Sequence, residues 1–324
     1  MGVNPDTREL LGAYALDAVD GDEAAAVAEL IAEDEDAERE LHRLRGAAAW
    51  VGATEALAPP RDLRTQLLQR ATPVPEEVRI YRMAMARHED LLDAVPAEAL
   101  DRPTANGLTV GELVVHLAAM ESAVAETVGF DQTVTDETEV VARTRHYLDA
   151  VGDDPLGRGR RAWRDAVDAL DAWAMAGGEQ GGLPWNGFTV SRRTLLATRA
   201  FETWTHDDDI RDALGRERLV PHPVELGVMS DIAVNILPFC LDAAGTTPAA
   251  AARLVLTGDG GGDWLVSLDG DEHPEPAVTI TMDVVDYCRV VAERIAPDEC
   301  AATLDGDAAL GRTVLACASA LATL

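Results

Sequence analysis

The sequence predicts a mainly α protein with a small N-terminal helical unit, a four-helix bundle and a C-terminal α+β domain. Three observations predict this fold class. Apolar residues recur at helical spacing through most of the first 220 residues, and runs rich in Pro or Gly interrupt them at residues 59–76 and 177–182. Short stretches that favour strands follow beyond residue 250. A chain of 324 residues accommodates two or three domains, and we expect them at residues 1–72, 77–220 and 221–324.

Composition and charge exclude several classes of function. Apolar residues make up 47% of the chain, which is ample for packed cores. The net charge is −31 and every basic residue is Arg, so phosphates would be repelled and nucleic-acid binding is not expected. We see no export leader and no apolar run of about 18 residues, which predicts a cytoplasmic protein without a membrane span. The four cysteines form no CxxC pair and are expected to be reduced, buried residues: Cys240, Cys288, Cys300 and Cys317.

The first unit is predicted to be a set of short helices. Residues 23–45 repeat apolar residues at helical spacing. Pro59-Pro60 ends the preceding helix, residues 62–70 favour one more short helix, and residues 72–76 have the composition of a linker.

This unit resembles the N-terminal domain of anti-sigma factors, the anti-sigma-K type in particular. Residues 10–20, 24–31 and 59–63 carry the resemblance. Zinc-binding members of that family hold a His-x3-Cys-x2-Cys set on the second helix, and Leu30, Asp34 and Ala37 stand at those places here. The resemblance therefore implies no zinc in this unit, and a sigma factor is a disfavoured but open partner. The alternative is a helical appendage that docks on its own chain or on a twin subunit, as in a homodimer.

The bundle is predicted from four helical regions. Apolar spacing indicates helices at residues 78–92, at 109–121, at 140–148 together with 160–173, and from Ser191 onward. Thr109 and Glu112 have the spacing of a capping box, and Ser191 can cap the last helix. Residues 182–189 are expected to form a loop. In an antiparallel bundle the second and fourth helices can face each other across the core.

Three side chains on these facing helices suggest a metal site. Glu202 and His206 are four residues apart, which places both on one face of the fourth helix, one turn apart. His116, on the second helix, can supply a third ligand from an otherwise apolar stretch. Two His and one Glu leave a fourth zinc position open, as catalytic sites require. The alternative is a solvated Glu–His pair with no metal.

The two stretches that hold these residues are similar to the mycothiol-dependent maleylpyruvate isomerase family, which belongs to the wider DinB-like metal-binding bundles. The family form is Thr-Val-x-Asp-Leu-Val-x-His-Leu, followed later by Glu-x3-His, Asp-Leu or Asp-Ile, and Ala-Leu-Gly. Residues 109–121 and 199–215 match it, except that Glu112 stands where the family has Asp. The resemblance implies that His116, Glu202 and His206 are the zinc ligands. Asp209 then takes a supporting position beside them, with a surface carboxylate as the alternative.

Residues 221–324 predict the α+β domain. A helix is expected from residue 223, strands at 253–257, 264–268 and 277–282, and a fourth strand at 300–304. Residues 258–262 are rich in Gly but join two strands and lack the Lys-Ser/Thr of a phosphate loop, so they predict a hairpin turn. This part resembles the C-terminal domain of the same isomerase family, which is similar to sterol-carrier folds.

The resemblance implies an enzyme in which zinc and a thiol act together. Mycothiol is the implied thiol, and its thiolate would add to or displace a group on a small electrophilic substrate, as an isomerase or an S-transferase. No Gly-x-Ser-x-Gly or CxxC motif suggests covalent Ser or Cys catalysis. Among the other histidines, His88 lies on the first bundle helix, where it can face the site or lie at the surface, and the surface position is favoured. The alternative function is a zinc- or thiol-sensing regulatory protein related to anti-sigma factors, without catalysis.

Overall fold

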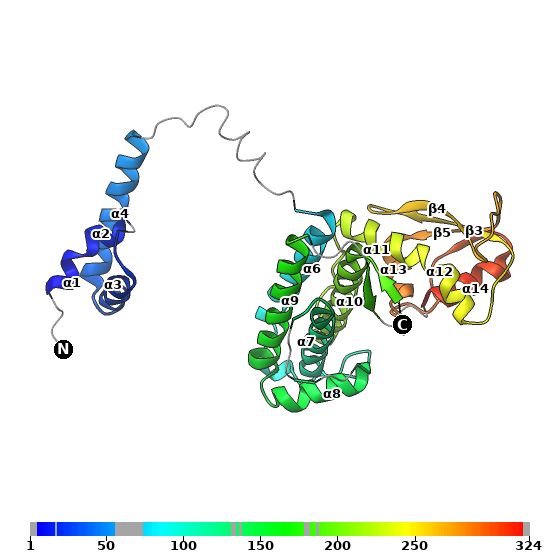
Figure 1. Ribbon diagram of the computed structural model, residues 1–324, viewed down its shortest axis with the longest axis horizontal. Coiled ribbons are helices and arrows are strands. Elements are labelled where there is room, and N and C mark those ends of the chain that lie inside the picture. The colour runs from blue at the N-terminus through cyan, green and yellow to red at the C-terminus, as the bar shows by residue number, and fades with distance from the viewer. Residues whose placement is uncertain are drawn as a thin grey trace. The chain divides into compact units, whose positions relative to one another are not determined.

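A computed structural model describes most of the chain (Figure 1). The described residues are 5–16, 18–55, 74–130, 134–135, 138–177, 182–185 and 188–319. The chain divides into two compact units, residues 1–73 and 74–324. The fold is mainly helical, as predicted, with a small mixed sheet in the C-terminal region. The expected helix at residues 62–70 lies outside the described residues.

In the described part of the first unit, four helices surround a small apolar core of their own. They are α1 (Pro5–Glu9), α2 (Leu11–Ala15), α3 (Gly21–Glu33) and α4 (Glu35–Glu55). The continuous helical stretch expected at residues 23–45 is broken at Asp34, whose carboxylate accepts the N–H groups of Asp36 and Ala37 and pairs with Arg8 at 2.8 Å. Leu30 and Ala37, two of the residues that the anti-sigma resemblance aligns with zinc ligands, are buried in this core and pack against apolar side chains.

The second unit begins with the helical bundle. Its helices are α6 (Glu76–Asp93), α7 (Val110–Thr127), α8 (Val140–Val151), α9 (Arg160–Met175) and α10 (Arg192–Ala213), with short turns η1 (Ala97–Ala99) and η2 (Pro155–Gly159). The predicted capping box of Thr109 and Glu112 forms at the start of α7, and Ser191 caps α10. Helix α10 packs along α6 and also contacts α7 (Figure 1). These caps and contacts determine which side chains of α7 and α10 face each other.

Two predictions for the bundle are wrong. Residues 182–189 are not only a loop, because β1 (Leu183–Trp185) and β2 (Phe188–Val190) form an antiparallel pair in which Leu183 faces Val190. The Asn-Gly dipeptide between the strands is a hairpin signal in the sequence. His88 is fully buried rather than on the surface, since Asp207 of α10 binds its Nδ1 at 2.6 Å.

The C-terminal region packs helices against a four-stranded sheet. Its elements are α11 (Pro223–Asn235), α12 (Leu237–Ala243), β3 (Ala251–Thr257), β4 (Gly262–Ser267), β5 (Pro276–Asp283), α13 (Val284–Val291), β6 (Thr303–Gly306) and α14 (Ala308–Ser319). The strand order is β4-β3-β5-β6, with β3 and β5 parallel and the other pairs antiparallel. The fourth strand starts three residues later than expected. The predicted hairpin turn at residues 258–262 is confirmed, and Gly260 in it (φ 88°) lies where a Cβ would meet the Pro223 carbonyl.

One apolar core runs through the second unit. It includes Val115 and Trp204 of the bundle and Leu226 and Ile280 of the C-terminal region. The core therefore has no break at residue 220, and the division of this unit into two domains stays a prediction.

The cysteines are free thiols, and most of them pack in the interior. Cys240, Cys288 and Cys317 are free and buried as expected, and Cys300 is partly exposed. Among the described residues, no single helix has both the length and the apolar composition needed to cross a membrane. Helices α11 and α12 meet these criteria only as a pair, which is bent by 41°.

Candidate metal centre

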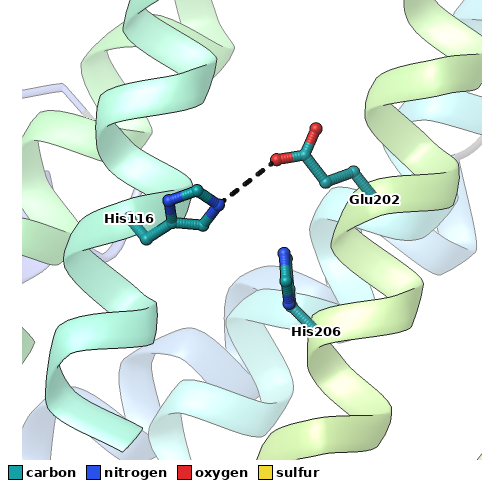
Figure 2. A group of neighbouring side chains, drawn as sticks. All are labelled: His116, Glu202 and His206. Atoms are coloured by element: carbon teal, nitrogen blue, oxygen red, sulfur yellow. Dashed lines mark ion pairs between the residues drawn. The ribbon is translucent and has the colours of Figure 1, made fainter. Parts of the chain in front are cut away.

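Helices α7 and α10 bring the three predicted ligands together. Figure 2 shows His116 extending from α7 toward Glu202 and His206, which project from successive turns of α10. One ligand atom from each residue lies within 4.8 Å of the other two. His116 Nε2 is 3.7 Å from Glu202 Oε1, and the two imidazole rings have centroids 5.2 Å apart at 88°. The structure thus places a His2Glu donor set around one point, although metal binding itself stays a prediction.

A threonine of α8 fixes the tautomer of His116. The Thr144 hydroxyl donates its proton to the Val140 carbonyl at 2.8 Å, so it can only accept from His116 Nδ1, which lies 2.9 Å away. With the proton on Nδ1, the Nε2 lone pair is free on the side that faces Glu202. This is the arrangement that an imidazole ligand of zinc requires.

The carboxylate of Asp209 fixes the tautomer of His206. Asp209, one turn further along α10, accepts from His206 Nδ1 at 3.0 Å. Its side chain is only 1% exposed, which rules out the surface carboxylate that the sequence left open. Burial alone would raise the pKa of Asp209, but the hydrogen bonds from His206 and Arg294 outweigh it and lower that pKa. Asp209 is therefore an acceptor, and His206 also has its Nε2 lone pair free.

A buried arginine orients Glu202. Arg199, fully buried one turn earlier on α10, donates Nη1 to Glu202 Oε2 and Nε to Glu121 Oε2 at 3.0 Å. The Tyr81 hydroxyl of α6 donates to the other oxygen of Glu121. Because Arg199 occupies Oε2, the Oε1 atom of Glu202 is left to face His116. Burial would raise the pKa of Glu202, but the Arg199 charge and the nearby imidazoles lower it.

The three side chains that carry the donor atoms are partly exposed. The side chains of His116, Glu202 and His206 are 13, 27 and 11% exposed, so a further ligand can approach from solvent. Around them, two carboxylates (Glu121 and Glu202) share one guanidinium (Arg199), which leaves one uncompensated negative charge. A divalent cation would supply the missing positive charge, and this favours a metal over an empty polar cluster.

The sequence predicted the three donors and Asp209 but not the residues that orient His116 and Glu202. Thr144, Arg199, Glu121 and Tyr81 were not singled out. A signal was present for two of them, since Glu121 ends a mainly apolar run on the second helix and Arg199 lies within the run Leu195-Leu-Ala-Thr-Arg-Ala-Phe201.

The burial of His116 predicts a specific pH dependence for the metal-free protein. Burial, then the neighbouring His206, lower the pKa of His116 from 6.5 to about 4. The unfolded chain therefore takes up this proton first, so the stabilising contribution is complete above pH 6.5 and is lost as the pH falls through about 4, by at most about 3 kcal/mol. We expect His116→Gln to reduce the change in the free energy of urea unfolding between pH 6.5 and about 4. The exposed His146→Gln is the control, and an equal slope in both variants would contradict the assignment.

Comparison with known proteins shows which family model the bundle matches. Residues 81–211 match the model of the mycothiol maleylpyruvate isomerase N-terminal domain. Two uncharacterized proteins of Mycobacterium tuberculosis, from strains CDC 1551 / Oshkosh and ATCC 25618 / H37Rv, are each 27% identical over 219 residues, covering 63% of this chain and 81% of theirs.

Two solved structures share the fold. They are crystal structures of the mycothiol-dependent maleylpyruvate isomerase and of a mutant of it, with TM-scores of 0.50 and 0.51 and identities of 19 and 17%. Each alignment covers 72% of this chain and 93% of the other. All three donors lie within the matched domain.

Proposed function

We propose that this protein, whose residues 81–211 carry the mycothiol maleylpyruvate isomerase N-terminal domain, is a zinc-dependent enzyme that uses a thiol to isomerise a small electrophilic substrate. One observation carries the proposal. The two imidazoles bind their neighbours through Nδ1, and Glu202 binds Arg199 through Oε2, so one free donor atom from each converges on a single point. The names of the two solved structures support mycothiol as the thiol and an isomerisation as the reaction.

The donor set fits zinc. His116 and His206 would bind through Nε2 and Glu202 through Oε1, which leaves a fourth position for an outside ligand. Zinc bound there would hold a thiol as its thiolate, the nucleophilic form. Thr144, Asp209 and Arg199 would keep the donors in place while that ligand exchanges.

Charge balance favours a thiolate in the fourth position. Glu121, Arg199 and Glu202 together leave one negative charge, and a divalent cation changes this to one positive charge. One bound thiolate neutralises it, whereas a neutral ligand leaves a charge in a partly buried site. The same residues therefore select a thiol that has lost its proton.

The reaction class follows from a nucleophilic thiolate beside a conjugated cis alkene. The sulfur–carbon bond forms as the alkene electrons move onto the activating carbonyl group. Rotation about the resulting single bond and loss of the thiolate then give the trans product. The thiol is regenerated, so no oxidant or reductant is consumed. An S-transfer would stop after the sulfur–carbon bond forms and a leaving group departs.

The test is turnover by the zinc-loaded protein. Maleylpyruvate is the first substrate to try, with mycothiol and with no thiol. We expect cis–trans isomerisation only when the thiol is present, and at least about a hundredfold loss in Glu202→Gln, since a neutral amide is a poor zinc ligand. Asp212→Asn is the matched control on α10, because Asp212 pairs with Arg218 at the surface.

Failure of this assay would have a defined meaning. Zinc and thiol binding without turnover of maleylpyruvate or other electrophilic alkenes would contradict the isomerase proposal. It would favour the regulatory alternative, in which the site senses zinc or thiol without catalysis.

A further inference from the structure

Three consecutive aspartates follow His206, and each pairs with a different residue of the second unit. Asp207 binds His88 of α6 at 2.6 Å, Asp208 binds Arg289 of α13 at 3.1 Å, and Asp209 binds Arg294, which follows α13. All three carboxylates are buried. Only Asp209 also contacts a metal-centre donor, since it accepts from His206 Nδ1.

Arg294 uses all three guanidinium nitrogens. Its Nε and Nη2 donate to the two oxygens of Asp209 at 2.7 and 2.6 Å, and its Nη1 donates to the Ala292 carbonyl at 2.5 Å. A two-bond contact of this kind fixes the plane of the carboxylate as well as its position. Asp209 is therefore held by a residue 85 positions away in the sequence, from the C-terminal region.

The backbone before Arg294 supports a specific role. Glu293 has φ of 58°, the left-handed region, and is the one non-Gly residue with positive φ among the described residues. This conformation costs about 1 kcal/mol for a residue with a Cβ. It turns the chain at the end of α13, so that the Arg294 N–H returns to the Arg289 carbonyl at 2.7 Å. The strained Glu293 backbone thus stands at the turn that brings the Arg294 guanidinium onto Asp209.

We infer that Arg294 is a positioning residue through which the C-terminal region completes the metal centre. Arg294 fixes the Asp209 carboxylate, and this carboxylate accepts the His206 Nδ1–H. The His206 ring is thereby kept with Nε2 toward His116 and Glu202. This inference rests on the metal centre of the proposed function but not on the reaction. Outer contacts of this type typically change metal affinity by 10–100-fold.

The test compares Arg294→Ala with Arg289→Ala in the full chain. Both remove an arginine from α13 or its end that pairs with an aspartate of α10, but Arg289 pairs with Asp208, which is not bonded to a donor. We expect Arg294→Ala to weaken zinc binding at least about tenfold in chelator competition and to change the visible spectrum of the cobalt-loaded protein. Arg289→Ala should leave both unchanged.

Two further variants separate positioning from folding. Arg294→Lys keeps the charge but loses the two-bond contact, so it should fall between wild type and Arg294→Ala. In an Asp209→Ala background, Arg294→Ala should add no further loss, because the arginine acts through the aspartate.

Each outcome decides the matter. Equal zinc affinity and equal spectra in the two arginine variants would overturn the inference, as would additive losses with Asp209→Ala or a wild-type protein that binds no metal. Weakened zinc binding in Arg294→Ala alone, with no thiol-dependent turnover by wild type, would uphold the inference while contradicting the proposed reaction.

Discussion

Alanine substitution of His116, Glu202 or His206 is expected to remove nearly all zinc from the protein, each change acting alone. The three donors come from two helices, and two protein ligands hold zinc far more weakly than three. The loss should appear in elemental analysis after removal of free metal. We expect about one zinc per chain in wild type and almost none in each variant.

Two variants serve as controls for this result. His273→Ala removes an imidazole that pairs with Asp269, away from the cluster, and Cys288→Ser changes a buried thiol of α13. Neither should change the zinc content. Full occupancy in one of the three alanine variants would remove that residue from the ligand set, and zinc loss in Cys288→Ser would mean that the site lies elsewhere.

Arg199→Ala is expected to lower the free energy of unfolding of the metal-free protein by about 3–5 kcal/mol, because it leaves two carboxylates without their shared cation. Arg199 and Glu121 are fully buried, so solvent cannot replace the lost ion pairs. Burial would lower the pKa of Arg199, but Glu202 and then Glu121 outweigh it and raise that pKa, so the guanidinium stays charged. Urea unfolding measures the change.

A surface arginine provides the comparison. Arg82 pairs with Asp171 in a partly exposed ion pair, and Arg82→Ala should cost less than about 1 kcal/mol. Adding Glu121→Gln to Arg199→Ala should recover part of the lost stability, since one uncompensated charge is removed. If Arg199→Ala were as mild as Arg82→Ala, the buried charge network would not have the role assigned to it.

Local sequence signals predicted most of what positions the site. Periodic apolar residues marked α7 and α10, and the caps at Thr109 and Ser191 fixed where each begins. Four-residue spacing placed Glu202 and His206 on one face of α10. These features depend on neighbours within one or two helical turns, which is why single-sequence reasoning reached them.

Contacts between distant segments were beyond such reasoning. The residues near His88 in the sequence do not indicate that it is buried or that it pairs with Asp207, which is 119 residues away. The Arg294–Asp209 contact joins residues 85 positions apart, and the sequence offered 27 arginines without distinguishing this one. At Asp34 a side-chain cap overrode a continuous helical pattern.

The most direct test of the central claim is to add mycothiol to the cobalt-loaded protein and record its absorption spectrum. A metal centre that activates the thiol predicts a new sulfur-to-cobalt charge-transfer band that saturates at about one thiol per metal and is absent in His206→Ala. A wild-type protein that holds about one cobalt per chain but shows no such band at saturating thiol would contradict the account.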